Sequence, residues 1–410
     1  MRQSQLFPKT RKEAPKDAES INHKLLVRGG FIDQLMSGSW TLLPLGFRVV
    51  SKINQIIREE MNAIGAQEML MPLLHPKEIW SETGRWDKAN EIMYKLKDVR
   101  KKEYVLSFTH EEIVMDLLRK NTKSYQDLPV AVYHFSTKFR NEPRARSGIL
   151  RGREFMMKDL YSAHVSEEDM LSYYEKVKEA YAKIFIRLGF NFKVVEASGG
   201  VFTDRHTHEF QVLDANGEDT IFACDTCNYA INKEIFEGKV GETCPKCKKG
   251  KIEKLNGLVE VGNIFPLGTW YAERMRVYFT DEEGKKKPIW FASYGIGPTR
   301  VMGTLVEVNN DEKGIIWPTA VSPFDIHLIE LPGAKNADKI YKELKESGMD
   351  VLWDDRDVPA GEKFAEADLI GIPVRLVISE KTGEKIEWKE RTSEKSELLS
   401  FEELLARLGK

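Results

Sequence analysis

The sequence predicts an α+β protein of two domains, the first interrupted by a small metal-binding insert. Three observations lead to this expectation. The chain has 410 residues, more than one ordinary hydrophobic core accommodates. Beyond about residue 320, strand and helix patterns alternate regularly. All four cysteines lie within residues 224–247. We therefore expect one domain over residues 1–320, an insert over residues 220–255 within it, and a second domain over residues 321–410.

Composition excludes several classes of function. The chain is 41% apolar and 31% charged, as is typical of globular proteins, and no apolar run approaches the roughly 18 residues that cross a bilayer. Residues 1–20 lack the apolar stretch of a secretory signal, so we expect a cytoplasmic protein without membrane association. The net charge of −2 does not by itself indicate a nucleic-acid partner, although residues 138–153 form a local basic segment. Taken alone, such a segment is more often a solvated loop.

The first domain contains an amphipathic helix near its beginning. Apolar residues between 49 and 64 recur at three-to-four spacing, and Gly65 ends the pattern. An apolar stretch over 66–74 follows, which predicts a strand interrupted by Pro72. The other elements expected here are a strand over 129–140, a return strand over 152–164, a helix over 167–189 capped by Ser166 and ended by Gly189, a strand over 287–297 and a helix over 298–308.

The second domain follows a proline-containing boundary near residue 320. Its pattern alternates between strands and helices, which predicts a small α/β domain with a mixed, largely parallel sheet. The expected elements are strands over 325–331, 349–355 and 372–379, and helices over 336–348, 361–371 and 400–409.

The cysteines form two C-x-x-C pairs, Cys224 with Cys227 and Cys244 with Cys247, at the spacing of a zinc ribbon. A disulfide between the cysteines of one pair is disfavoured because it would close only a tiny loop, and a redox motif would need one pair. Four protein ligands complete a tetrahedron and leave no open position, so the site is expected to hold structural Zn²⁺ without a catalytic role.

Three scattered stretches contain residues suited to phosphate chemistry. They are "FRNE" (139–142) followed by Arg151, Phe155 and Asp159; "GIGPTR" (295–300) at a strand-to-helix junction; and the helix and Pro-containing strand that end at Pro72. In this order they resemble motifs 2, 3 and 1 of the class II aminoacyl-tRNA synthetases. The segments "SETGRW", "SFTHEE", "RGREFMMKDLYSAH", "HEFQVL", "EVGNIFPLGT" and "DDRDVPAGEKFAEADLIGIP" resemble those of bacterial prolyl-tRNA synthetases, so the resemblance covers nearly the whole chain.

The resemblance implies a fold, a reaction and partners. The fold is a catalytic domain built on an antiparallel sheet flanked by helices, joined to an anticodon-binding domain, and dimerised through motif 1 into a homodimer. The reaction joins L-proline to the α-phosphate of ATP, accompanied by Mg²⁺, and then transfers the prolyl group to tRNA(Pro). Arginine suits both steps because its planar fork binds carboxylate and phosphate bidentately.

The resemblance also assigns roles to individual residues. Arg140 would bridge the proline carboxylate and the α-phosphate, and Thr109 and Glu111 would receive the two N–H groups of the proline ammonium. The remaining assignments are Arg300 (catalytic, with Arg140) and Arg151 on the outer phosphates, Glu142 on the adenine amino group, Phe155 stacked on adenine, Gln211 in the ATP site, and Arg356 and Lys363 as anticodon contacts.

Each assignment has a purely structural alternative. The Arg140–Glu142 pair would then be a surface ion pair, Phe155 a core aromatic and the turn at Thr109 a helix N-cap with acidic residues in its first turn. Arg356 and Lys363 would lie on a solvated face.

The chain departs from the prolyl pattern at a few positions. Asn263 stands where these enzymes usually have His, and Pro266 and Trp270 are also unusual. Thr299 before the motif 3 arginine is normal for the prolyl branch. His206 and His208 suggest the catalytic zinc of the related threonine enzymes, but no cysteine remains to complete such a site, so ordinary polar roles are favoured.

Two other functions remain open from the sequence. One is a synthetase for another small amino acid, and the other is a catalytically silent paralogue that binds tRNA or regulates. The second is disfavoured because Arg140, Glu142, Phe155 and Arg300 are all present.

The cysteine-rich insert lies between motifs 2 and 3, where many bacterial prolyl enzymes carry a large editing domain. Only about forty residues separate "HEFQVL" from "EVGNIF", which leaves no room for such a domain. The sequence therefore predicts an enzyme that does not clear mischarged alanyl-tRNA in cis.

Overall fold

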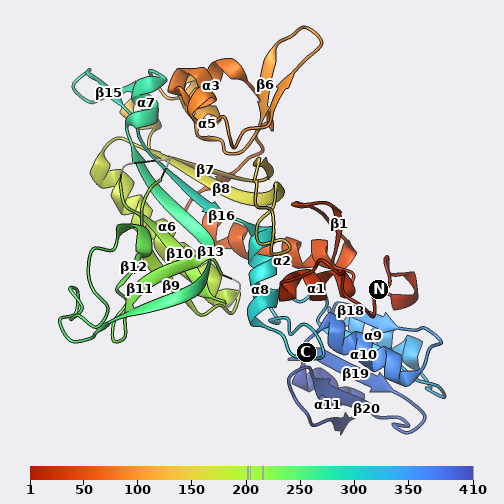
Figure 1. Ribbon diagram of the computed structural model, residues 1–410. Coiled ribbons are helices and arrows are strands. Elements are labelled where there is room, and N and C mark those ends of the chain that lie inside the picture. Colours follow the sequence, from red (N-terminus) through yellow and green to blue (C-terminus); the bar gives the residue numbers. More distant parts are fainter. Residues whose placement is uncertain (201–202, 204, 215–216, 410) are drawn as a thin grey trace. The chain divides into compact units, whose positions relative to one another are not determined.

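The computed structural model describes residues 1–410 except 201–202, 204, 215–216 and 410 (Figure 1). The chain forms two units. Unit 1 comprises Met1–Leu35, Trp40–Ile53 and Leu305–Lys410, and unit 2 comprises Met36–Ser39 and Asn54–Thr304. Helices α2 (Pro44–Ala63) and α8 (Pro298–Val308) each contribute residues to both units. No helix in the described part of the chain is long and apolar enough to cross a membrane.

Unit 2 is built on a sheet of nine strands within the described residues. In spatial order these are β10 (Thr207–Leu213), β9 (Phe192–Ala197), β12 (Ala230–Asn232), β11 (Asp219–Cys224), β13 (Ile252–Gly268), β16 (Trp290–Ile296), β8 (Glu154–His164), β7 (Val130–Phe139) and β3 (Gln67–Glu68). The central pairs β13–β16, β16–β8 and β8–β7 are antiparallel. The predicted antiparallel sheet is therefore confirmed at its centre.

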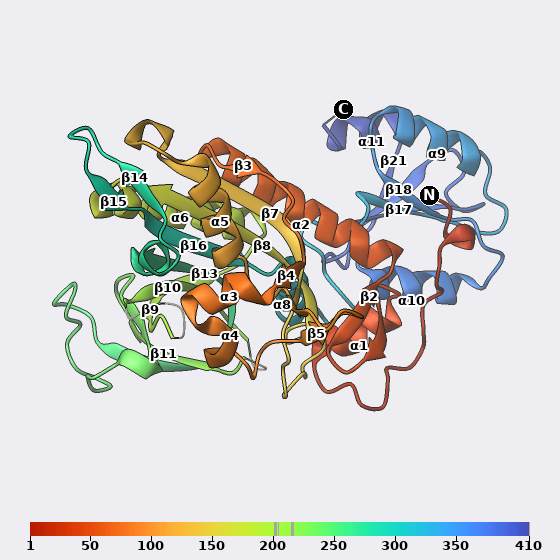
Figure 2. The same cartoon turned by 90° about the horizontal axis from the view of Figure 1, so that it is seen from above.

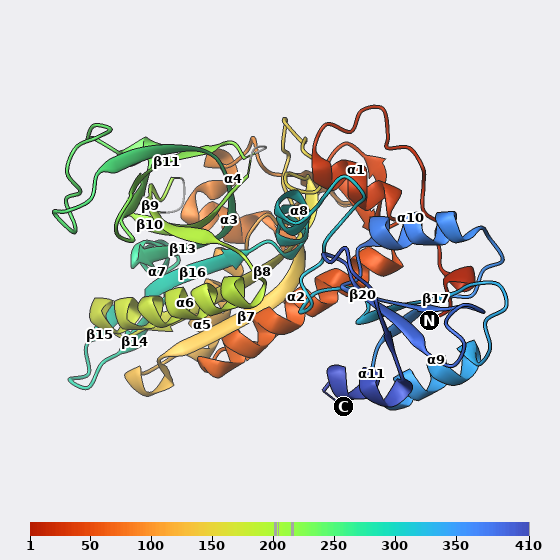
Figure 3. The same cartoon turned by 90° about the horizontal axis from the view of Figure 1, so that it is seen from below.

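The hairpin of β7 and β8 is the longest pairing in this sheet, from Val130 opposite Ala163 to Phe139 opposite Glu154. Both strands lie within two residues of their predicted bounds. Helix α6 (Glu167–Arg187) follows, and the Ser166 hydroxyl accepts a hydrogen bond from the Asp169 amide at 3.2 Å, as a capping residue does. Figure 3 shows α6 lying along the sheet, whereas Figure 2 shows α5 (Glu111–Asn121) near the opposite face, so helices cover both sides.

Five of the strands close into a ring, because β10 pairs with β13 as well as with β9. The cysteine-rich segment projects from this ring. Cys224 ends β11, and Cys244 and Cys247 lie shortly before the start of β13. Since β13 continues into the central sheet, the insert and the centre of unit 2 share one strand (Figure 1).

Unit 1 contains a five-stranded sheet in the described residues, ordered β18 (Val351–Asp354), β17 (Ile326–Glu330), β19 (Val374–Ile378), β20 (Ile386–Glu390) and β21 (Glu397–Leu399). The first three strands are parallel and the last two antiparallel, which confirms the predicted mixed sheet. The helices that alternate with the strands of this sheet or follow them are α9 (Ala337–Glu346), α10 (Ala360–Ile370) and α11 (Phe401–Arg407), and all three were predicted.

The N-terminus packs on the edge of this sheet. The Met1 ammonium donates to the Val351 carbonyl at 2.7 Å, and the Trp353 amide donates to the Met1 carbonyl at 2.9 Å. The contacts thus group the first residues with those beyond 305, whereas the sequence predicts a division near residue 320.

Two predicted strands are interrupted at prolines. The strand expected over 66–74 is two short pieces, β3 and β4 (Leu74–Pro76), on either side of Pro72. The strand expected over 287–297 consists of β15 (Lys286–Pro288) and β16, because Pro288 has no N–H to continue the ladder. Elements not predicted from the sequence are η1 (Gln3–Gln5), α1 (Ile21–Arg28), β1 (Ile32–Met36), β2 (Ser39–Leu42), α3 (Lys77–Thr83), α4 (Arg85–Lys88), β5 (Lys95–Lys97), β6 (Glu103–Leu106), α5, η2 (Tyr125–Asp127), β9, β10, β11, β12, η3 (Lys233–Ile235), β13, α7 (Trp270–Arg274), β14 (Tyr278–Thr280), β20 and β21.

Candidate active site

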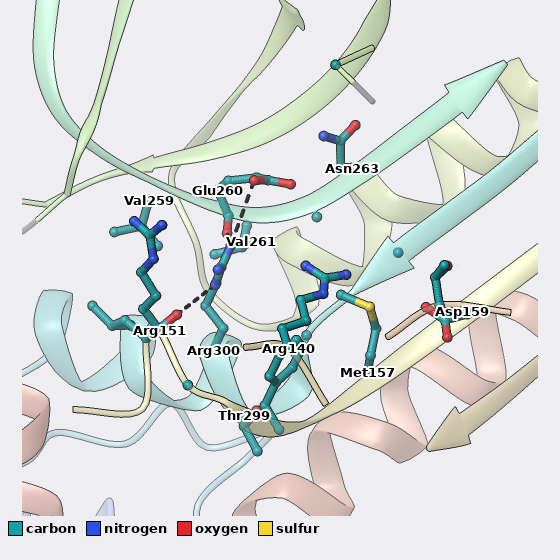
Figure 4. A pocket seen from close by; sticks show the side chains of 18 of the residues that line it. Arg140, Arg151, Met157, Asp159, Val259, Glu260, Val261, Asn263, Thr299 and Arg300 are labelled. Atoms are coloured by element: carbon teal, nitrogen blue, oxygen red, sulfur yellow. Dashed lines mark hydrogen bonds and ion pairs between the residues drawn. The ribbon is translucent and has the colours of Figure 1, made fainter. Parts of the chain in front are cut away.

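A cavity of about 540 Å³ opens on the sheet of unit 2. Strands β8, β13 and β16, the turn before α5 and the start of α8 supply its walls (Figure 4). Seven of the predicted site residues line it together: Thr109, Glu111, Arg140, Glu142, Arg151, Phe155 and Arg300. Gln211 does not line it.

Arg140 follows the last residue of β7, and its guanidinium points toward β13 across the cavity (Figure 4). The guanidinium carbon lies 5.3 Å from the centre of the Phe155 ring. Nε is buried and has no hydrogen-bond partner among the described residues. Burial and the nearby Arg300 lower the pKa of Arg140 below its usual value. The cavity thus contains a cation short of acceptors, which is suited to an anionic ligand.

Arg300 lies at the start of α8 and is held by three contacts. Nε donates to the Leu150 carbonyl at 2.9 Å, Nη1 donates to the Glu260 carbonyl at 3.1 Å, and the Glu260 carboxylate is 3.8 Å away. Gly303, one turn further along α8, is needed for this packing. A Cβ at that position would lie 2.9 Å from the side chains of Ile149 and Leu150.

Arg151 and Glu142 contact each other at the mouth of the cavity, with 2.9 Å between Nε and Oε2. Arg151 also pairs with Glu218 at 2.7 Å, and the Glu142 carboxylate accepts from the Arg144 amide at 2.8 Å. Both groups are therefore satisfied within the chain. A ligand that binds Arg151 or Glu142 therefore has to replace one of these existing contacts.

The first turn of α5 contains a buried carboxylate pair, Glu111 and Glu112. The Thr109 hydroxyl donates to Glu111, with oxygen separations of 2.8 and 2.7 Å. Arg85 Nη1 contacts both Glu111 at 3.1 Å and Glu112 at 3.0 Å. His110 is the N-cap residue and no side chain caps the helix, but Glu111 and Glu112 are acidic residues of its first turn, so the structural alternative holds for the acidic first turn and not for a side-chain cap. Two carboxylates around one arginine favour an additional cation here.

Beneath this turn, Lys138 is buried within a polar cluster. Its ammonium contacts Asp159, lies 2.7 Å from His110 Nδ1 and 3.2 Å from His134 Nε2, and donates to Ser136 Oγ at 2.8 Å. His110, His134 and Asp159 have the geometry of a metal site, but the ammonium lies among them. Because His110 Nδ1 accepts from Lys138, Nε2 carries the proton and donates to the Pro72 carbonyl at 2.9 Å. Lys138 therefore fixes the tautomer and the orientation of His110, which lies between Thr109 and Glu111 in the sequence.

Gln211 lies behind the cavity wall. Its amide donates to Glu209 at 2.8 Å and to Asp219 at 2.9 Å, and Asp219 lines the cavity. The Asn263 amide also donates to Glu209, at 3.4 Å. Burial and the neighbouring Glu260 raise the pKa of Glu209 to about 8. Gln211 thus orients the acidic side of the cavity and does not face its interior.

The chain is similar to known proteins in both of its parts. Residues 94–309 match the family described as tRNA synthetase class II core domain (G, H, P, S and T), and residues 320–410 match the family described as anticodon binding domain. The proline–tRNA ligase of Agrobacterium fabrum (strain C58) is 38% identical over 98% of this chain and 98% of its own length. The chain belongs to the proline–tRNA ligase family. A second member, from Persephonella marina, is 35% identical over 98% of this chain and 99% of its own length.

Solved prolyl-tRNA synthetases share the fold of this family member. The enzyme of Cryptosporidium parvum, complexed with L-proline and AMP, superposes with a TM-score of 0.77 at 17% identity, over 95% of this chain and 74% of its own. The enzyme of Giardia lamblia, in complex with prolyl-adenylate, superposes with a TM-score of 0.78 at 17% identity, over 94% and 75%.

The four cysteines of this family member lie together as predicted. The Sγ atoms of Cys224 and Cys247 are 3.7 Å apart, as are those of Cys227 and Cys244. A disulfide would require about 2.0 Å. Two sulfurs bound at about 2.3 Å to one tetrahedral zinc ion lie about 3.8 Å apart, so the donor set fits zinc.

The structure holds both predicted anticodon-binding residues in contacts within unit 1. Arg356 pairs with Asp354 at 2.8 Å and Glu366 at 2.9 Å, and Lys363 is buried with its ammonium on the Glu330 carbonyl at 2.6 Å. Their role in anticodon binding stays a prediction, and it would require these contacts to be exchanged for contacts with a base. The solvated-face alternative does not hold, because buried Asp354 draws both cations inward.

The two histidines of "DRHTHEF" lie apart from metal ligands. His206 contacts Glu196 at 2.5 Å, and His208 contacts the Tyr174 hydroxyl at 2.8 Å. Neither belongs to a group of metal-ligating residues in the described part of the chain. Their polar contacts support the favoured interpretation.

Several residues of the site were not singled out from the sequence. They are Lys138, Tyr161, Glu209, Asp219 and Glu260. Tyr161, Glu209 and Glu260 lie within segments that carried the family resemblance. Their position in those segments is the only signal in the sequence that could have identified them. Lys138 had no such signal beyond the basic segment.

The titration of Glu209 has a consequence for stability. Its folded pKa of about 8 exceeds the ordinary value of 4.5, so its contribution is complete below about pH 4.5 and is lost as the pH rises through about 8. We expect the urea midpoint of the wild type to fall between pH 6 and 9 by more than that of Glu209→Gln, which stays neutral. Glu175→Gln, on an exposed position of α6, is the control. Parallel profiles for wild type and Glu209→Gln would contradict this assignment.

Proposed function

We propose that this protein attaches L-proline to tRNA(Pro) with ATP, through a prolyl-adenylate intermediate. The observation that carries the proposal is the gathering of Arg140, Arg300, Thr109 and Glu111 around one cavity, in a chain similar over its full length to proline–tRNA ligases. These residues come from three separated segments, because Thr109 and Glu111 lie in the same one. In this proposal, anion-binding and ammonium-binding groups line the same cavity.

The chemistry follows from these positions. Thr109 and Glu111 accept the two N–H groups of the cyclic ammonium. Arg140 binds the proline carboxylate and the α-phosphate, so the attacking oxygen and the phosphorus are held close together. As pyrophosphate leaves, charge develops on the phosphate oxygens, and Arg140 and Arg300 stabilise it without moving.

The other predicted roles belong to the same proposal. Arg151 binds outer phosphates, Phe155 stacks on adenine and Glu142 accepts from the adenine amino group. Gln211 acts indirectly, through Glu209 and Asp219. Mg²⁺ accompanies ATP and shields its phosphates.

The test is ATP–pyrophosphate exchange by the purified protein with each amino acid in turn. Exchange that depends on proline supports the proposal. Exchange with threonine or another small amino acid, but not proline, would change the substrate. No exchange with any amino acid would favour a silent tRNA-binding paralogue.

We further propose the predicted division into a catalytic domain over residues 1–320 and an anticodon-binding domain over residues 321–410, with an insert over 220–255 that takes the place of an editing domain. The alignment with the Persephonella marina protein spans 559 positions, 149 more than this chain has, whereas that with the Agrobacterium fabrum protein spans 436. Long relatives thus carry a segment that has no counterpart here. Rapid deacylation of alanyl-tRNA(Pro) by the purified protein would refute the absence of cis-editing.

The homodimer is also part of the proposal. Leu70, which follows the edge strand β3, is 82% exposed, and Leu74 is 50% exposed. An apolar surface at a sheet edge is suited to burial against a second copy. A monomeric mass at micromolar concentration in sedimentation would contradict it.

We propose that the four cysteines bind one structural Zn²⁺ per chain. The apolar cluster around them is small, with Cys224, Cys244 and Ile252 buried. The insert therefore needs a metal ion or another cross-link to stabilise its fold. Removal of the metal, or Cys247→Ser, should unfold residues 225–251 while α6 keeps its hydrogen-exchange protection. Co²⁺ substitution gives a second readout, because tetrahedral thiolate ligation produces strong visible absorption. Protection of residues 225–251 that survives complete metal removal would contradict a structural metal.

A further inference from the structure

The second half of the cysteine-rich insert presents four lysines, Lys246, Lys248, Lys249 and Lys251, within six residues. All four are exposed. None of their Nζ atoms forms an ion pair with a carboxylate in the described part of the chain, at a limit of 4.0 Å. The whole protein has a net charge of −2, so this concentration of positive charge is local. We call these four residues the ribbon lysines.

The backbone beneath the ribbon lysines is fixed by hydrogen bonds. The Gly250 amide donates to Cys247 Sγ at 3.3 Å, the Lys248 amide donates to the Cys244 carbonyl at 3.0 Å, and the Lys251 amide donates to Asp225 Oδ1 at 3.0 Å. Lys248 has a φ of 59°, which places it in the left-handed region that completes a tight turn. The turn presents the four side chains from a defined base, which lowers the entropy cost of their binding.

The ribbon lysines are joined to the cavity by a single strand. β13 begins at Ile252, directly after Lys251, and its residues from Leu258 to Asn263 form one wall of the cavity. At about 3.3 Å per residue, Lys251 lies within roughly 30 Å of Glu260. Figure 1 shows β13 running from the loops beyond β11 and β12 to the central strands.

This placement fits the substrate. A tRNA whose terminal ribose reaches the cavity holds its double-stranded acceptor stem outside the mouth, at distances of this order. The stem presents two rows of phosphates. Lysine ammonium groups bind phosphate without regard to base sequence, and clusters of them are typical of nucleic-acid backbone contacts.

We propose that the ribbon lysines bind the phosphate backbone of the tRNA acceptor stem during transfer of the amino acid. The insert then contributes to the second step of the reaction and has no part in the first. This inference rests on the proposed aminoacylation of tRNA. The alternative is a solvated charged surface that makes no contact.

The experiment replaces all four lysines, as Lys246→Ala, Lys248→Asn, Lys249→Ala and Lys251→Ala. Asparagine is chosen at position 248 because it tolerates the left-handed backbone. The control carries the same change of charge elsewhere in unit 2, as Lys101→Asn, Lys102→Ala, Lys285→Ala and Lys286→Ala. These lysines are exposed on the β5–β6 and β14–β15 hairpins, away from the insert in Figures 1 and 2, and Lys101 also has a positive φ.

Two rates are measured for each protein: proline-dependent ATP–pyrophosphate exchange, and aminoacylation of tRNA at KCl concentrations from 50 to 200 mM. For the ribbon variant we expect exchange unchanged and KM for tRNA raised by at least about tenfold at 50 mM. The slope of log(kcat/KM) for tRNA against log[KCl] should become shallower by about one for each phosphate that a lysine no longer neutralises. The control variant should resemble the wild type in both rates. Zinc content, measured for all three proteins, shows that the insert has kept its fold.

The outcomes separate this inference from the proposed function. If the wild-type protein showed no proline-dependent ATP–pyrophosphate exchange, the proposed function itself would be wrong. A ribbon variant with normal zinc content that charges tRNA with the KM and salt slope of the wild type would overturn the inference alone. An equal loss of activity in the control variant would also overturn it, because the effect would then be one of overall charge.

Discussion

Replacement of Arg140 by alanine should reduce proline-dependent ATP–pyrophosphate exchange by about 10³-fold or more. The guanidinium has a buried Nε without a partner among the described residues and faces the cavity, so its donors are available to the reacting groups. Loss of a single preorganised donor to developing charge typically costs 10²- to 10³-fold, and Arg140 offers several. Single-turnover formation of the adenylate measures the effect directly.

Arg144→Ala is the matched control. This arginine belongs to the same basic segment and is exposed, but its side chain does not line the cavity. The Arg144 contact to Glu142 is made by its backbone amide and survives the substitution. Exchange that persists in Arg140→Ala, or that is abolished equally in Arg144→Ala, would show that the site has been assigned wrongly.

Substitution of Glu111 by glutamine should raise KM for proline about 10- to 100-fold and leave KM for ATP unchanged. A hydrogen bond between charged groups contributes about 1.5–3 kcal/mol, and Glu111 is the carboxylate placed to receive the proline ammonium. The change removes one negative charge without changing the shape of the side chain.

Glu112→Gln separates binding from stability. Both glutamates are buried and both contact Arg85, so each substitution should lower the free energy of unfolding by about 1–3 kcal/mol. Only Glu111 lines the cavity. A rise in KM for proline of the same size in both variants would mean that Arg85 and its partners act through structure and that Glu111 does not contact the substrate.

Local signals in the sequence were sufficient for some of the elements near the site, but not for β13, which forms one wall of the cavity and was not predicted. The strands β7 and β8 have long apolar runs, and α6 has a capping serine and an apolar stripe, so their bounds were predicted within two residues. The site arginines were identified from the sequence because the planar guanidinium group is suited to binding phosphate and carboxylate. Their approach to one another depends on the pairing of β8, β13 and β16, which no local pattern specifies.

Features set by distant contacts were missed. Met1 pairs with residues near 352, and no signal in the first twenty residues reports this. The segment around Arg356 has the composition of an exposed loop, but Asp354 is buried at the end of β18 and binds the nearby cations. Lys138 was grouped with a solvated basic segment because its partners His110 and Asp159 are remote in sequence.

Within the described residues, two clusters have side chains that could bind a transition metal: the four cysteines, and His110 with His134 and Asp159. The two clusters differ in whether they depend on a metal ion taken up from solution. In the proposed zinc site the cysteines depend on an ion from the surroundings, so chelators, scarcity and competing metals would all act on them. The ammonium of Lys138 is attached to the chain and cannot be extracted, exchanged or displaced by copper, which outcompetes other divalent ions at imidazole ligands. The base of the cavity beside Thr109 and Glu111 is consequently assembled from groups of the chain itself, without an ion.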